Sequence, residues 1–80
     1  MGASRLDDRV GPNGESREWL ILASIRAGGY PHVAAQAYGI RLKRFLCWLR
    51  RGRGRLAGKV LDAAARARLK AEMTVYEADP

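Results

Sequence analysis

The middle of the chain is strongly basic, and this is the clearest chemical feature of the sequence. Between Trp19 and Leu61 there are nine Lys or Arg residues and no acidic residue. The two flanking segments hold the other six cations and all eight acids, so the excess positive charge belongs to the middle. Twelve of the fifteen cations are Arg, whose planar guanidinium group suits phosphates and base edges. This segregation is typical of nucleic-acid binding, whereas a merely solvated surface mixes both signs.

Groups for catalysis or metal binding are scarce. His32 is the only histidine and Cys47 the only cysteine, which excludes a Cys/His zinc cluster. No second residue pairs with His32 in the spacing of a Cys/His or Ser/His relay. We interpret His32 as a residue at a helix start that makes local hydrogen bonds or touches a phosphate, and Cys47 as a packing or surface residue. The spacing of Gly52, Gly54 and Gly58 does not fit a dinucleotide-binding or ATP-binding loop. We therefore expect no enzymatic activity, no metal and no cofactor.

The length of the chain suits one small domain with a single core, because only 80 residues are available. The first residues contain no apolar signal-peptide core, and no run approaches the roughly 20 apolar residues of a membrane span. One cysteine cannot form an intrachain disulfide. We expect a soluble, cytoplasmic protein that does not bind membranes.

Turn residues and apolar spacing predict an all-α fold with four helices. Residues 1–15 are rich in glycine and polar groups, so we expect a flexible arm there. Ser16 suits the N-cap of a first helix over about 16–27, which the pair Gly28–Gly29 ends. A second, alanine-rich helix is predicted over about 31–38, because proline suits its first position.

The second half of the chain contains two further predicted helices. The third begins near Arg41 or Leu42 and ends at the first glycine of the basic run. Residues 53–58 are expected to form a basic hinge, since glycine alternates with arginine. A final amphipathic helix is predicted from about 59 to 76 within the segment 59–80. Its apolar stripe should either mediate self-association or pack back onto the core, and it consists of Leu61, Ala65, Leu69, Met73 and Tyr76.

Residues 16–52 have the pattern of a helix-turn-helix domain. The small Ala35 lets two helices touch, Gly39 permits the tight corner, and Phe45 and Trp48 clamp the third helix onto the first two. The pattern resembles the homeodomain-like helix-turn-helix of phage terminase small subunits and transposases, and Ile25–Ile40, Phe45 and Trp48–Gly52 carry this resemblance. It implies binding to double-stranded DNA by a small, oligomeric, non-catalytic protein. The implied partner is a larger catalytic subunit such as a terminase or transposase.

The third helix is expected to enter the major groove of DNA with its cationic side. The candidate DNA-binding residues are Arg41, Lys43, Arg44, Cys47, Arg50, Arg51, Arg53 and Arg55. The first five lie on or near the exposed side of the helix, and the last three are expected at the DNA backbone or minor groove. The run Arg51–Arg55 fits equally well a solvated linker that touches phosphates without selectivity.

A second class of function also fits the sequence, namely a protein-interaction or scaffold module. In that hypothesis Leu42 and Leu46 form an exposed apolar docking face, and the basic surface binds RNA or an acidic protein. Retention on DNA over a salt gradient separates the two hypotheses, because phosphate binding weakens steeply with salt.

Overall fold

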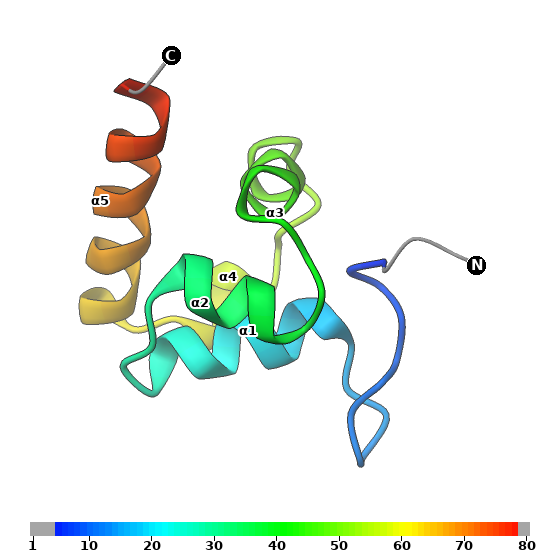
Figure 1. Cartoon of the computed structure of the whole chain (residues 1–80). Coiled ribbons are helices and arrows are strands. Elements are labelled where there is room, and N and C mark those ends of the chain that lie inside the picture. The colour runs from blue at the N-terminus through cyan, green and yellow to red at the C-terminus, as the bar shows by residue number, and fades with distance from the viewer. Residues whose placement is uncertain (1–4, 79–80) are drawn as a thin grey trace.

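The computed structural model describes residues 5–78, and this part of the chain is all-α, as predicted. Figure 1 shows α1 and α2 crossing the middle of the molecule, α3 projecting from them and α5 standing along one side. The helices are α1 (Arg17–Arg26), α2 (Pro31–Ala37), α3 (Leu42–Arg50), α4 (Ala57–Val60) and α5 (Ala63–Ala78).

Local signals set both ends of α1. The Trp19 amide N–H donates to Ser16 Oγ at 3.1 Å, so Ser16 is the N-cap that the sequence predicts. At the other end, the Gly29 amide N–H donates to the Ser24 carbonyl at 2.9 Å and closes the last turn. The helix therefore begins and ends within one residue of its predicted bounds.

The corner between α2 and α3 is built on Gly39. Its φ of 75° lies in the left-handed region, which glycine adopts at little cost. The next residue, Ile40, donates its amide N–H to the Ala35 carbonyl at 2.9 Å and buries its side chain. Because the turn is closed by hydrogen bonds and sealed by an apolar side chain, it fixes how α3 leaves α2.

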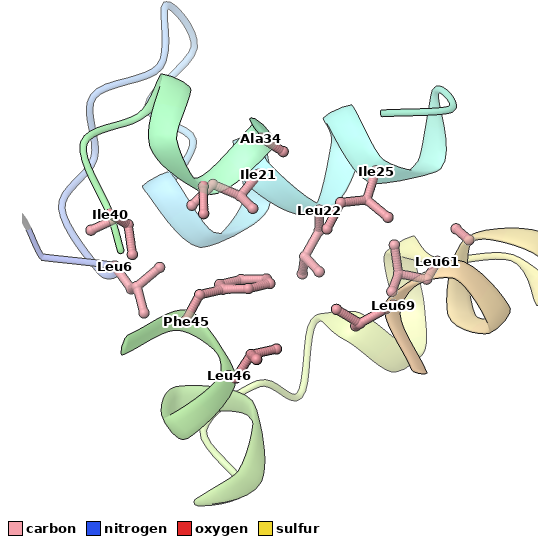
Figure 2. Packing of buried hydrophobic residues seen from close by; sticks show 12 residues of the cluster. Leu6, Ile21, Leu22, Ile25, Ala34, Ile40, Phe45, Leu46, Leu61 and Leu69 are labelled. Atoms are coloured by element: carbon pink, nitrogen blue, oxygen red, sulfur yellow. The ribbon is translucent and has the colours of Figure 1, made fainter. Parts of the chain in front are cut away.

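The core is assembled around Phe45, whose side chain is completely buried. Figure 2 shows its ring between Leu6 and Ile40 on one side and Leu69 on the other. The buried apolar cluster contains residues from α1, α2, α3 and α5, and consists of Leu6, Ile21, Leu22, Ile25, Ala34, Ala35, Ile40, Phe45, Leu46, Leu61, Ala65 and Leu69.

The segment before α1 is packed, although its composition predicts a flexible arm over 1–15. Residues 1–4 lie outside the described residues, but Leu6 is only 1% exposed and belongs to the core. The Arg17 and Glu18 amide N–H groups donate to the carbonyls of Asp8 and Leu6, both at 2.9 Å. These are first-turn donors of α1 that lack partners within the helix. One buried leucine and two backbone hydrogen bonds therefore hold a segment that is otherwise polar.

The C-terminal part contains two helices in place of the single helix expected from about residue 59. The chain is extended at Leu61, and the Asp62 carboxylate accepts a hydrogen bond from the Ala65 amide N–H at 2.8 Å. Asp62 thus caps α5, which begins at Ala63. The shorter α4 precedes this break. The sequence signal for the break was an Asp at an N-cap position, which the long apolar stripe concealed.

Helix α5 packs back onto α1 and α2. Ala65 and Leu69 are buried, so this part of the predicted stripe is used within the chain. The Arg68 guanidinium donates to the Ile25 carbonyl near the end of α1. None of the helices in residues 5–78 has the length and apolar character needed to cross a membrane.

The predicted basic hinge over 53–58 is held against α3. An ideal Cβ at Gly54 would lie 3.1 Å from the Leu49 Cα atom, so only glycine allows the chain to pass this close to the end of α3. Ala57 and Gly58 already belong to α4. Gly54 is therefore required for packing as well as for turning the chain.

Leu6→Ala tests whether the segment before α1 belongs to the core. We expect this change to lower the free energy of unfolding by about 2–5 kcal/mol, the usual cost of truncating a buried leucine. Urea unfolding followed by far-ultraviolet circular dichroism measures the change. Val10→Ala is the control, because Val10 lies in the same segment and is 47% exposed. Equal effects of the two substitutions would mean that Leu6 does not stabilise the fold.

Candidate nucleic-acid interface

Helix α3 has one apolar face and one cationic face. Leu42, Phe45, Leu46 and Leu49 recur at the i, i+3, i+4 and i+7 spacing, and all four pack in or against the core. Leu46 is only 4% exposed, and Leu42 is half-buried. The exposed docking face expected from Leu42 and Leu46 is therefore a wrong prediction, because the core of the chain covers this side of the helix.

The cationic face of α3 and the segment before α1 border a hollow of about 510 Å³, which we call the basic groove. Six of its lining residues are Lys or Arg, and one is acidic. The lining consists of Arg5, Asp7, Arg41, Lys43, Arg44, Cys47, Trp48, Arg51 and Arg53. A concave surface with this charge attracts a polyanion.

The cations of the basic groove have no ion-pair partner among residues 5–78, whereas several cations elsewhere in the chain pair with an acid or donate to a carbonyl. None of the six forms an ion pair with another residue between 5 and 78. Outside the groove, Arg17 pairs with Asp8 at 2.9 Å, and Arg66 donates to the Gly58 carbonyl at 2.7 Å. The groove therefore gathers positive charge that the described part of the chain does not neutralise.

Six of the eight predicted DNA-binding residues line the basic groove, and two do not. Arg50 lies at another side of α3, where it forms an ion pair with Glu77 of α5. Arg55 is exposed but does not line the groove. The six are Arg41, Lys43, Arg44, Cys47, Arg51 and Arg53.

Three groove residues were not among the predicted ones. Arg5 and Asp7 reach the groove because Leu6, which lies between them, is buried in the core. A lone leucine in a polar segment was the one sequence signal for this placement. Trp48 was predicted only as a clamp between helices, and it also lines the groove.

Trp48 connects three parts of the site. Its indole Nε1–H donates to the Glu18 carboxylate, which ties α3 to α1. The Arg53 guanidinium lies over the indole ring, 5.7 Å from the ring centroid, at a distance that permits a cation–π interaction. The ring itself is half-buried against the core. Trp48 therefore positions the start of the basic run relative to α3.

Glu18 is a buried carboxylate behind Trp48, with only 3% of its surface exposed. Desolvation raises the pKa of Glu18 above its usual value of 4.5, and the hydrogen bond from Trp48 opposes this shift. The sequence identified Glu18 only as an acid in the first turn of α1. Its contact with Trp48 depends on tertiary packing.

The beginning of α3 has an unfavourable charge distribution. Arg41 occupies the N-cap without a side-chain cap hydrogen bond, and the first turn contains no acid. Lys43 and Arg44 stand in that turn instead. Cations are unfavourable there because the N-terminal end of a helix carries partial positive charge. A bound anion would relieve this repulsion.

His32 lies at the start of α2, as predicted, but its hydrogen-bond partner is on α5, far along the chain, and not local. Glu72 Oε1 on α5 accepts from the His32 amide N–H at 2.8 Å and lies 2.6 Å from His32 Nδ1. Glu72 thereby supplies an acceptor at the start of α2, whose N-cap residue Tyr30 provides none. In the part of the chain that the structure describes, His, Cys, Asp and Glu side chains form no cluster of three or more that could hold a metal ion.

No protein-family model, curated protein or solved structure matches this sequence. The interpretation of the basic groove therefore rests on its own geometry and charge. Both favour a surface that binds a polyanion.

Glu18→Gln is expected to raise the free energy of unfolding at neutral pH. The folded chain holds the Glu18 proton more tightly than the unfolded chain, so the stability that this group contributes falls as pH rises above 4.5. Gln does not ionise, and its side-chain oxygen still accepts from Trp48 Nε1. Urea unfolding near neutral pH and at about pH 4 should show that the advantage of the variant is larger at neutral pH.

Glu15→Gln is the matched control, and the pH dependence of its effect on stability is expected to have the opposite sign. Hydrogen bonds from the backbone N–H groups of Glu15 itself and of Asn13 lower the pKa of Glu15. This carboxylate therefore contributes stability at neutral pH that is lost as pH falls. The same pH response in both variants would contradict the effect of burial at Glu18.

Proposed function

We propose that the chain binds double-stranded DNA and that α3 is the recognition helix. The basic groove carries this proposal, because six cations without ion-pair partners among the described residues gather around α3, on the helix, at its two ends and on the neighbouring segment before α1. In this proposal α1, α2 and α3 form the helix-turn-helix predicted over 16–52. The closed corner at Gly39 supports that assignment.

The size and placement of α3 support entry into the major groove. An α-helix with its side chains is about 10–12 Å across. The nine residues of α3 extend about 13.5 Å along its axis, enough to follow the groove over a few bases. The major groove of B-DNA is about 12 Å wide and admits an α-helix. Figure 1 shows α3 projecting from α1 and α2, and Lys43, Arg44 and Cys47 on α3 are exposed, so this side of the helix can approach a duplex.

The groove residues divide into two roles in this proposal. Lys43 and Arg44 lie in the first turn of α3, and we assign them to base edges, where Arg pairs with guanine O6 and N7. Arg51 and Arg53 follow the end of α3, and we assign them to phosphates. Direct base contact would supply sequence preference, whereas the phosphate contacts would supply affinity.

The finer proposal is a DNA-recognition module of the terminase-small-subunit or transposase type. Its basis is the resemblance carried by Ile25–Ile40, Phe45 and Trp48–Gly52. In this role the chain recognises DNA, and a separate catalytic subunit performs the chemistry. Self-association through the whole predicted stripe is disfavoured, since Leu61, Ala65 and Leu69 are buried within the chain and Tyr76 is its exposed end.

A protein-docking function has less support. Its apolar face required Leu42 and Leu46 to be exposed, and Leu46 is buried. Double-stranded RNA is also disfavoured, because its deep and narrow major groove does not admit a helix. Single-stranded RNA remains a competitor on charge alone, so it is included in the binding experiment.

Arg51→Ala measures the contribution of the basic groove to binding. Fluorescence anisotropy with a labelled duplex should show affinity that falls steeply with salt. The substitution should reduce the magnitude of the slope of log affinity against log salt by about one unit. Arg26→Ala is the matched control, because Arg26 is also an exposed arginine at the C-terminal end of a helix but lies outside the groove. Equal effects of the two changes, or tighter binding to single-stranded RNA, would refute the proposal.

Cys47 reports directly where DNA binds. It is the only cysteine, and it is exposed in the basic groove. Saturating duplex DNA is expected to slow alkylation of its thiol by a maleimide at least several-fold. A Cys47→Ser, Thr74→Cys double variant moves the thiol to an exposed position on α5 and should show no protection. Unchanged alkylation of Cys47 in the complex would place the DNA elsewhere.

A further inference from the structure

Asp7 is the one acidic residue that lines the basic groove. It is exposed and forms no ion pair with any residue between 5 and 78, although six cations line the same hollow. The neighbouring Asp8, by contrast, pairs with Arg17 at 2.9 Å. The groove therefore contains an unpaired carboxylate in a place that is otherwise suited to anions.

The backbone on both sides of Asp7 is fixed. On one side, Leu6 is buried, and its carbonyl accepts from the Glu18 amide N–H at 2.9 Å. On the other side, the Asp8 carbonyl accepts from the Arg17 amide N–H at 2.9 Å. These anchors hold the Asp7 backbone at a defined position on the groove wall, from which its side chain extends to line the groove.

Elementary chemistry restricts what this carboxylate can bind. A phosphate placed beside it is repelled, so the charge lowers affinity for DNA of any sequence at that point. An ionised carboxylate accepts hydrogen bonds and donates none, so its partner must be a donor. In the major groove the donors are the exocyclic amino groups of cytosine and adenine, and Asp characteristically accepts from cytosine N4.

We propose that Asp7 is a specificity-determining residue of the DNA site, an inference that rests on the proposed function. Its carboxylate accepts a hydrogen bond from N4 of one cytosine, beside the bases that α3 contacts. Against a phosphate, or against a base that offers only acceptors, the same charge is unfavourable. Asp7 therefore disfavours non-specific complexes and favours one base at one position.

The test is selection of binding sites from a random duplex pool by the wild-type chain, Asp7→Asn and Asp7→Ala. Because Asn pairs with adenine N6 and N7, the site selected by Asp7→Asn should change from cytosine to adenine at one position. Asp7→Ala should lose the preference there, with discrimination against other bases reduced about 5- to 150-fold. Both variants should bind a scrambled duplex more tightly than the wild-type chain does.

Glu15→Gln controls for net charge, because Glu15 lies in the same segment but does not line the groove. It should select the wild-type site. Identical sites for the wild-type chain and both Asp7 variants would overturn this inference and leave the proposed function standing. A wild-type chain that binds duplexes without selecting a sequence would also overturn it. A wild-type chain that binds no duplex would overturn the proposed function, and this inference with it.

Discussion

Burial of Phe45 fixes the direction in which α3 faces. The helix is short and has one apolar stripe, so its orientation depends on which side chain enters the core. With Phe45 completely buried, the helical period turns the cationic face away from the core. Leu6 joins the same cluster beside Phe45 (Figure 2) and brings Arg5 and Asp7 alongside α3. One hydrophobic cluster thus builds both walls of the basic groove.

The distribution of partners separates structural cations from groove cations. Arg50 pairs with Glu77, and Arg68 donates to the Ile25 carbonyl, so these arginines connect α5 to α3 and α1. The groove cations make no ion pair within residues 5–78, and like charges at short range repel one another. Functional surfaces commonly reduce stability in this way, because their charges are arranged for a ligand that the free protein lacks. The proposed binding of DNA agrees with that arrangement.

The sequence predicted those features that neighbouring residues determine. Ser16 and Gly39 act through contacts within a few residues, so the bounds of α1 and the corner before α3 could be predicted from local pattern. Leu6 could not, because its burial depends on the core formed by residues far along the chain. For the same reason six groove residues could be identified from α3 and the basic run, whereas Arg5 and Asp7 could not. Asp62 carried a local signal, but the apolar stripe on both sides of it favoured one continuous helix.

The cations in the first turn of α3 have a consequence for the free protein. Their repulsion, and that of the helix end, is an electrostatic effect of exposed charges, which mobile ions screen over a Debye length of about 8 Å at physiological ionic strength. Added salt should therefore stabilise the free fold, while the same salt weakens attraction to a polyanion. Low ionic strength would then strengthen binding under the same conditions in which the unbound chain is least stable. In such conditions much of the ligand's effect would be to hold the protein folded, and affinity and thermal stability would be coupled through one set of charges.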